Sequence, residues 1–346
     1  FVSGQEIMQF FGVFGKNGLV GMVLAICLFG TFGYIFMYLA KQEKITTIDQ
    51  IIMGEGKTIL HRFFNGVSLF FLFGVTVIML AGAGSLLNEL LGIPYFVGSA
   101  CLTVLLAILS MKGMKGILVI SQTVVPILLV LVVIISLWSM VIFPAEEISG
   151  TLSQNGNPLL GNWFLATLSF FSYNILAALA VLTPAAQRTT DMKTIKKGIV
   201  QGSIQLLLIF ACILISLQRF YGRIEGANFP MQALAGQLSP VLGTLYAVLL
   251  LSAMFSGALS CMFGATVQLF GEKEKKKSVI LMLWGIALVC SMAGFKELIS
   301  VIFPVCGYAY LIAMPLTFRR FLTIRRKVGE AMNLSHNKYD DLVSTR

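Results

Sequence analysis

The sequence predicts an all-α integral membrane protein with ten transmembrane helices. Of its 346 residues, 57% are hydrophobic and only 12% are charged, whereas soluble domains carry about 25% charged residues. Long apolar runs such as Ile127 to Trp138 and Leu206 to Leu217 show no alternation of apolar and polar residues. This pattern favours helices over a β-barrel. A helix needs about 20 mainly apolar residues to cross a bilayer, so little of the chain remains for a soluble domain.

Ten apolar segments follow one another, separated by short polar or charged loops. The first is the shortest and begins on a polar motif, and the sixth ends at Pro184. Pro126 and Pro304 fall in the middle of the fifth and tenth segments, where we expect kinks. The segments are 1–15, 18–40, 64–88, 94–111, 116–143, 162–184, 197–217, 240–270, 277–294 and 297–317.

The positions of the basic residues predict the topology. Of the 25 Lys and Arg residues, all but Lys16, Arg219, Arg223 and Lys296 lie in the loops 41–63, 112–115, 185–197 and 271–277 or after residue 317. The positive-inside rule places this group in the cytoplasm. The loop 144–161 contains acidic but no basic residues, as expected outside. An even number of crossings then puts both chain ends in the cytoplasm.

The net charge of +10 is therefore interpreted as a signal of topology, not as a nucleic-acid site. We expect the bilayer as a partner and no nucleic acid. The basic tail 318–346 is compatible either with a place on anionic headgroups or with a solvated end. The oligomeric state is not encoded in any pattern that we can identify.

No catalytic or metal-binding pattern is present in the sequence. The six cysteines, Cys27, Cys101, Cys212, Cys261, Cys290 and Cys306, lie in apolar runs without metal-ligand spacing, so we expect small core residues and no disulfides. His61 and His336 are far apart in polar loops. The chain lacks the GxxxxGK[ST], HExxH and GxSxG patterns, so we expect neither ATP-driven transport nor an enzyme.

Two short motifs divide the chain into halves. FVSGQEI (Phe1 to Ile7) and FFSYNIL (Phe170 to Leu176) both place a Ser two residues after a Phe and an amide, Gln5 or Asn174, two residues after the Ser. Each motif lies in the first helix of a half of five, and an odd number of crossings makes the halves antiparallel, as in inverted repeats. The predicted units are the first repeat 1–143, the outer loop 144–161, the second repeat 162–317 and the tail 318–346.

These motifs predict helix breaks that would line a central site. Gly, Ser, Asn and Gln weaken a helix in the membrane, and freed backbone groups must line a cavity or be covered by protein. Substrate-binding candidates are Ser3, Gly4, Gln5 and Glu6 with Ser172, Tyr173 and Asn174. Glu6 is the acidic residue within segment 1, and an ionisable group in a membrane suggests function. The alternatives are a structural Glu facing outward and ordinary interhelical hydrogen bonds.

The stretch SGQEIMQFF that follows Phe1 resembles the hallmark of the YkvI-like bacterial membrane proteins, relatives of the amino acid–polyamine–cation transporter superfamily. The likeness covers the whole chain. It implies the LeuT-type fold of five plus five helices, with helices 1 and 6 unwound at the substrate, in the bacterial plasma membrane. Family members have a Gly-x-Gly step before the Phe. This sequence begins just after that step, so we expect the cytoplasmic half of helix 1 to be missing.

The resemblance also implies a place for a coupling ion. In sodium-coupled relatives, hydroxyls on helix 8 join helix 1 carbonyls around Na⁺, and here Ser260 is the best match and Ser256 the second. The pattern departs from an adjacent Ser/Thr pair, because Leu259 and Cys261 flank Ser260. Small residues at this spacing also permit close helix packing. Proton-coupled relatives can carry a Lys on helix 5, but the segment 116–143 contains none.

Two functions are compatible with these observations. The first is a secondary active transporter of a small organic solute, such as an amino acid or related zwitterion, that works by alternating access with Na⁺ or H⁺ coupling. The second is a ligand-sensing receptor subunit on the same fold, as in spore germinant receptors, which binds without net transport. Accumulation of substrate in sealed vesicles would discriminate between them. Apart from Na⁺, no cofactor is expected.

Overall fold

The computed structural model describes residues 3–43, 59–112, 117–144, 156–189, 191–271 and 277–344, and no strand occurs among them. Some parts of the predicted segments, including Phe1, Val2 and most of the loop 144–161, lie outside the described residues. The helical elements are α1 (Gln5–Phe10), η1 (Gly12–Phe14), α2 (Lys16–Gln42), α4 (Ile59–Leu91), α5 (Tyr95–Lys112), α6 (Ile117–Ile142), η3 (Pro158–Leu160), α7 (Trp163–Arg188), α8 (Met192–Arg219), α9 (Tyr221–Ile224), α10 (Pro230–Leu238), α11 (Pro240–Phe270), α12 (Lys277–Ser291), α13 (Phe295–Leu311) and α14 (Ala313–Ser344).

An integral membrane, all-α architecture is confirmed by the length and composition of these helices. Six described stretches are long and apolar enough to span a bilayer, and three shorter apolar helices accompany them. Together they account for the predicted segments from 18–40 onward. The segment 1–15 folds as α1 and η1, of which α1 has only six residues. The arrangement as two antiparallel halves, and the unit boundaries drawn from it, stay predictions.

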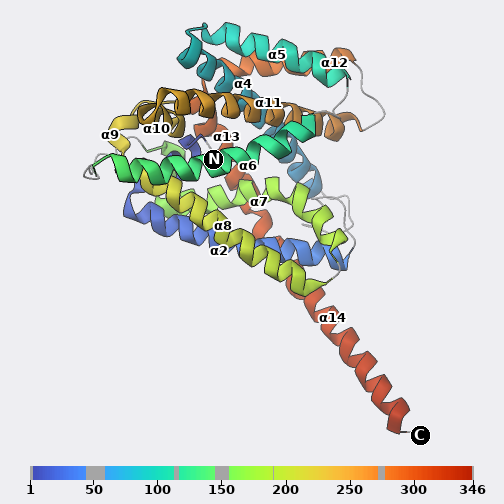
Figure 1. The fold of residues 1–346 in the computed structure, drawn as a ribbon. Helices are drawn as coiled ribbons and strands as arrows, with labels where there is room; N and C mark the ends of the chain where they lie inside the picture. The colour runs from blue at the N-terminus through green and yellow to red at the C-terminus, as the bar shows by residue number, and fades with distance from the viewer. Residues whose placement is uncertain are drawn as a thin grey trace.

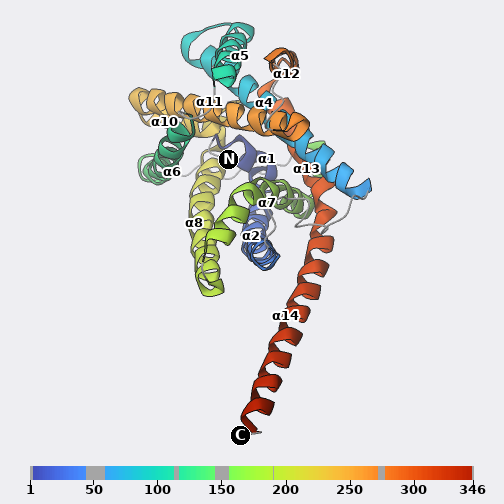
Figure 2. The same ribbon diagram turned by 90° about the vertical axis from the view of Figure 1, so that its right-hand side faces the viewer.

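The helices pack as two groups with α1 between them. In the first, α2 lies beside α7 and α8; in the second, α4 packs against α11, α5 and α12 (Figure 1). The groups are joined by α13, which contacts both α7 and α4. Seen from the side, α1 lies at the centre of the molecule, in contact with α7, α8 and α13 (Figure 2). The short helix α1 is thus placed where the two groups meet.

The core is rich in aromatic side chains around α1 and α7. The largest fully buried residues there are Phe10, Phe11, Phe170, Phe171 and Tyr173. Their rings meet at tilted or edge-to-face angles, as between Phe11 and Phe170 with centroids 4.8 Å apart. Such pairs add about 0.5–1.5 kcal/mol beyond burial. The surroundings of α1 are therefore densely packed.

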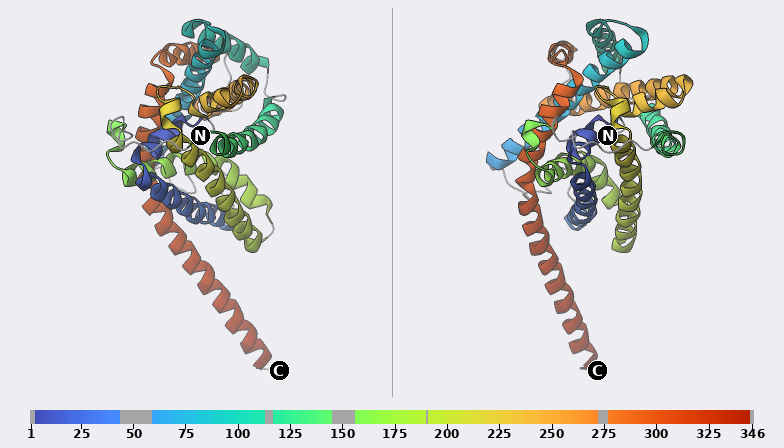
Figure 3. Two further views of the ribbon diagram at one scale, coloured as in Figure 1. Left: turned by 60° about the vertical axis from the view of Figure 1, so that its left-hand side comes forward. Right: turned by 90° about the vertical axis from the view of Figure 1, so that its left-hand side faces the viewer.

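The structure differs from the sequence predictions in several helices. The predicted break at Ser172 to Asn174 is wrong, because α7 runs without interruption from Trp163 to Arg188. The helices α9 and α10 were not anticipated. The tail is helical up to Ser344 and projects away from the bundle as α14 in every view (Figure 3).

The prediction that the cysteines are small core residues is only partly correct. All six cysteines are free thiols. Cys306 is buried, but Cys27, Cys101 and Cys290 are exposed on their helices. The reason is that a lipid-facing helix surface is as apolar as the core. The apolar pattern of a segment therefore does not show which of its residues are buried in the protein and which face outward.

Candidate functional site

The start of α1 is anchored on α10 by its backbone. Ser3 is in a turn, and its hydroxyl oxygen accepts a hydrogen bond from the Gln5 N–H at 3.3 Å, while its carbonyl accepts one from the Met231 N–H at 3.2 Å. Gly4 has a φ of +81°, and a Cβ there would lie 3.0 Å from Met231 Cγ. A side chain is disfavoured both by the left-handed backbone and by this contact. The described chain therefore enters α1 through a non-helical Ser3–Gly4 step, and a break within helix 1 stays a prediction.

The sequence motifs meet where α1 faces α7. The phenol of Tyr173 donates a hydrogen bond to Glu6 Oε1, and Asn174 Nδ2 lies 3.5 Å from the same oxygen. Glu6 is 7% exposed and Tyr173 is 2% exposed. Burying a carboxylate is costly unless donors surround it, and here a phenol and an amide from the other half of the sequence lie against it.

The side chain of Asn174 explains why α7 continues through the predicted break. Its Nδ2 donates to the Phe170 carbonyl at 3.0 Å, one helical turn earlier. A polar side chain that bonds back to the preceding turn is accommodated inside a helix without breaking it. Ser172 is fully buried, and its Oγ has no hydrogen-bond partner among the described residues. Gln5, also buried, completes the predicted set at the start of α1.

Aromatic rings enclose the Glu6–Tyr173 contact, and the sequence analysis did not identify them. Tyr173 is stacked on Phe303 of α13 with centroids 4.7 Å apart and an interplanar angle of 11°. Phe10 and Phe71 approach the same ring at 5.7 Å and 6.1 Å. In an apolar run these Phe residues cannot be distinguished from ordinary core, so no signal in the sequence could have found them.

The position of Phe303 depends on a close approach of α13 and α7. A Cβ on Gly307 would lie 2.1 Å from Ser169 Oγ and 2.6 Å from the Ser169 carbonyl oxygen, so only Gly fits there. Pro304 lies inside α13 and lacks the N–H that would bond to the Ser300 carbonyl. That carbonyl instead accepts a hydrogen bond from Asn157 Nδ2 at 2.6 Å. The proline is thus accommodated without an unsatisfied group at Ser300.

A second polar side chain missed by the sequence analysis stabilises the junction between η1 and α2. Gln218, near the end of α8, is 4% exposed. Its Nε2 donates to the carbonyls of Gly12 at 3.3 Å and Gly15 at 2.9 Å. These carbonyls lie where the chain turns from η1 into α2. The sequence offered one signal for this residue, because Gln218 places an amide at the end of an apolar run.

The predicted ion ligands Ser256 and Ser260 lie on α11, which packs mainly against α4. Ser256 Oγ donates to the Ala253 carbonyl at 3.1 Å, and Ser260 Oγ donates to the Ser256 carbonyl at 2.8 Å. Both bonds stay within α11, so a sodium site shared with α1 stays a prediction. Among the described residues, no group of three His, Cys, Asp or Glu side chains could hold a metal ion.

Comparison with known proteins identifies two relatives that span nearly the whole chain. The "Uncharacterized membrane protein YkvI" of Bacillus subtilis (strain 168) is 27% identical over 316 residues, which cover 90% of this chain and 88% of the relative. The "Uncharacterized protein YyaD" of the same organism is 24% identical over 311 residues, covering 89% and 88%. No protein-family model matches the chain. These similarities confirm the resemblance inferred from SGQEIMQFF: over nearly its whole length the chain is a homologue of the membrane protein YkvI, and its described helices include six that are long and apolar enough to span a bilayer.

Proposed function

We propose that this protein is a secondary active transporter of a small organic solute that carries an amino group, such as an amino acid or related zwitterion. The observation that supports the proposal is the contact of Glu6 with Tyr173 and Asn174 between α1 and α7. A buried carboxylate in a membrane-embedded core is a functional feature by default. Its donors come from a second helix, so a change of partner at Glu6 would alter how α1 and α7 pack.

The aromatic surroundings favour a cationic group in the solute. The faces of Phe and Tyr rings attract ammonium ions, and Tyr173 with Phe303, Phe10 and Phe71 supplies such faces beside the carboxylate. In our proposal the solute ammonium replaces the Tyr173 hydroxyl at Glu6, and the Ser172 hydroxyl becomes available to a carboxylate or other polar group. Coupling to Na⁺ at Ser256 and Ser260, or to H⁺, is part of the same proposal.

The proposed orientation puts the C-terminus and α14 in the cytoplasm of a bacterial cell. It is supported by the concentration of Lys and Arg in the loops on that side. A reporter fused after Arg346 that is active only in the cytoplasm tests this. Activity of a reporter that works only outside would reverse the topology.

Thermal unfolding of the purified protein against a panel of amino acids and amines, each in Na⁺ or K⁺, tests the binding step. A ligand at about 100 times its Kd should stabilise the protein by roughly 2.7 kcal/mol. We expect Glu6→Gln to abolish this stabilisation. The matched control is Glu89→Gln, because Glu89 is an exposed carboxylate that accepts a hydrogen bond from Asn228 Nδ2 at 2.7 Å. An equal response of both variants would contradict a role for Glu6.

Uptake of the same solute into sealed proteoliposomes tests the transport step. We expect accumulation that depends on an ion gradient and is lost in Glu6→Gln. Binding without accumulation would overturn transport and favour the ligand-sensing alternative. Uptake that only equilibrates the solute across the membrane and does not respond to an ion gradient would exclude coupling and identify a facilitator.

A further inference from the structure

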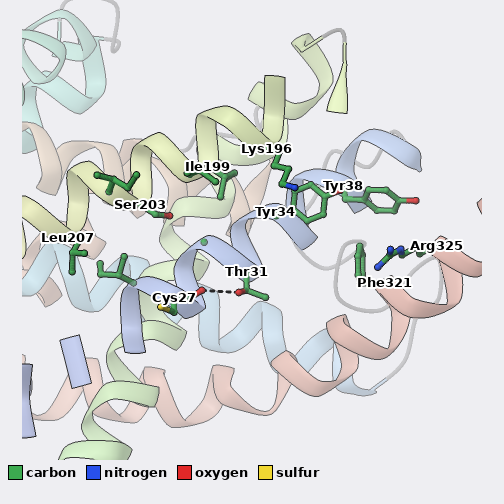
Figure 4. A pocket seen from close by; sticks show the side chains of 14 residues that line it. Cys27, Thr31, Tyr34, Tyr38, Lys196, Ile199, Ser203, Leu207, Phe321 and Arg325 are labelled. Atoms are coloured by element: carbon green, nitrogen blue, oxygen red, sulfur yellow. Dashed lines mark hydrogen bonds between the residues drawn. The ribbon is translucent and has the colours of Figure 1, made fainter. Parts of the chain in front are cut away.

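A groove of about 860 Å³ runs along the outer surface between α2, α8 and the beginning of α14. Its wall is apolar along most of its length, with Ile26 from α2 and Ile199 and Leu207 from α8. Small residues, Gly30 and Ser203, bring the two helices close together: a Cβ on Gly30 would lie 3.1 Å from Ser203 Oγ. Figure 4 shows Ile199, Ser203 and Leu207 along the groove. The middle of the groove is therefore suited to a hydrocarbon chain.

One end of the groove has a different chemistry. Lys196 from α8 and Arg325 from α14 extend toward this end, where Tyr34 and Tyr38 of α2 also lie (Figure 4). Both basic side chains are on exposed residues. Within the part of the chain that the structure describes, neither has an acidic side chain at ion-pair distance. Two cations and two phenols thus converge from three helices.

The position of α14, and with it Arg325, is fixed by contacts of α14 with the end of α2. Phe321 packs edge-to-face on Tyr38 with centroids 5.2 Å apart. Arg320, the residue before Phe321, forms an ion pair with Glu43, which follows the last residue of α2. The basic end is therefore a built feature of the packing between α2 and α14.

The groove also lies where a lipid would be found. Val200 and Ile204, which line it, are 50% and 54% exposed, as expected for residues that face hydrocarbon. Lys196 is close to the first residue of α8, Met192, so the basic end is at the end of a membrane span. A basic pocket between membrane helices at this depth is typical of a site for anionic headgroups.

We propose that this groove is a binding site for one anionic phospholipid. An acyl chain lies along Ile26, Ile199 and Leu207, and the phosphate is bound by Lys196 and Arg325 with the phenols of Tyr34 and Tyr38. The occupant is a lipid, not a soluble phosphate, because the groove is open to the bilayer over its apolar length. A bound lipid would bridge α8 to α14 and so connect the bundle with the projecting helix.

The test is the quantity of lipid that stays with the protein after purification and exchange into mixed micelles of phosphatidylglycerol and phosphatidylcholine, measured by native mass spectrometry. Each basic residue near an anionic surface contributes about fivefold in affinity. We therefore expect the double variant Lys196→Glu, Arg325→Glu to lower phosphatidylglycerol affinity roughly thirtyfold or more. Ile204→Trp, which fills the apolar part, should lower retention of the lipid without changing the charge.

The control is Arg62→Glu with Lys277→Glu, which makes the same change in net charge at the exposed starts of α4 and α12, away from the groove. We expect this variant to retain phosphatidylglycerol like the unmodified protein. Equal loss in both double variants would overturn the proposal, since a diffuse surface charge would then be responsible. Equal retention of phosphatidylcholine by the unmodified protein would also overturn it.

Two further comparisons distinguish binding of a lipid from binding of a soluble anion and from misfolding of a variant. Glycerol 3-phosphate carries the phosphate without acyl chains, and we expect it to leave the thermal unfolding temperature unchanged where phosphatidylglycerol raises it. Equal stabilisation by the two compounds would overturn the lipid assignment. If a groove variant fails to fold, the comparison of phosphatidylglycerol, phosphatidylcholine and glycerol 3-phosphate on the unmodified protein still decides the proposal.

Discussion

The phenol of Tyr173 donates a hydrogen bond to the carboxylate of Glu6 across 167 residues of sequence. The contact joins the short helix α1 to the middle of α7, and both residues are buried. The polar residues of each motif interrupt an apolar run in the sequence. In the structure the two motifs are therefore in direct contact.

Replacing Tyr173 by Phe should destabilise the folded protein. The Glu6 carboxylate would lose its phenol donor, and a buried acceptor without a partner costs about 1–3 kcal/mol. We expect the lower end of this range, because Asn174 Nδ2 lies 3.5 Å from the same oxygen. Unfolding in detergent, followed with and without Glu6→Gln, would measure the energy of the pair as a double-mutant cycle.

Tyr308→Phe is a matched control for this change. Its phenol donates to the Leu159 carbonyl at 2.5 Å in a more exposed position, where water can replace the lost bond. We expect a loss below about 0.5 kcal/mol. A larger loss for Tyr308→Phe than for Tyr173→Phe would contradict the importance of burial at Glu6.

Gln218→Leu should destabilise the start of α2. The change keeps a similar volume but removes the donor to the carbonyls of Gly12, which is buried, and Gly15, which is half-buried. We expect a loss of about 1–3 kcal/mol in the free energy of unfolding. Gln205→Leu, at an exposed position of the same helix, is the control and should change stability little. The interpretation fails if the two variants lose the same stability.

The sequence predicted the membrane helices well because their signal is length and hydropathy, which the bilayer imposes on each helix separately. The segment 163–188 shows the limit of this reasoning. Ser172 to Asn174 suggested a break, but the Asn174 amide bonds back to Phe170 and then reaches Glu6. Whether a polar side chain breaks a helix depends on partners from another helix, which local pattern cannot supply.

The contact of Glu6 with Tyr173 and Asn174 joins residues that the sequence named as candidates, whereas the apolar surroundings of this contact were missed. An ionisable group such as Glu6 is conspicuous in an apolar run, and its partners followed from the internal repeat. Phe71 and Phe303 became recognisable as neighbours of Tyr173 only in three dimensions. The same holds for Lys196 and Arg325, which the helices α8 and α14 contribute to one groove.

Gly307→Ala should weaken the packing of α13 on α7. The added Cβ would lie 2.6 Å from the Ser169 carbonyl oxygen, a backbone atom that cannot turn away. We expect a loss of about 1–3 kcal/mol, typical of overpacking in a tight core. The measurement is thermal or denaturant unfolding of the purified protein.

Gly285→Ala provides the control for helix propensity. Gly285 is inside α12, and a Cβ there would meet no atom within 4 Å. Ala is preferred over Gly in a helix by up to about 1 kcal/mol, so this variant should be neutral or more stable. If both variants gain stability, the close approach of α13 and α7 at Gly307 is not present in the protein.

Asp191 should make the stability of α8 dependent on pH. Its side chain caps the helix by accepting the Thr194 N–H at 2.9 Å, and hydrogen bonds from the Thr194 side chain and backbone hold the pKa of Asp191 below its ordinary value of 3.8. A carboxyl whose pKa is lowered by folding stabilises the folded state above its unfolded pKa. That contribution disappears as the pH falls through the lower, folded-state pKa. Asp191→Ala should therefore be less stable than the unmodified protein at pH 7, with a smaller difference near pH 3.

The corresponding cap of α7 distinguishes the effect of titration on stability from the effect of helix capping. Asn162 accepts the Leu165 N–H at 2.9 Å with a side chain that does not titrate. Asn162→Ala should cost about 1 kcal/mol, and its difference from the unmodified protein should be the same at both pH values. The two variants compared at pH 7 and pH 3 by thermal unfolding form the test. A pH-independent loss in Asp191→Ala would mean that the cap at α8 acts through geometry alone, because only a charged acceptor links helix capping to proton binding.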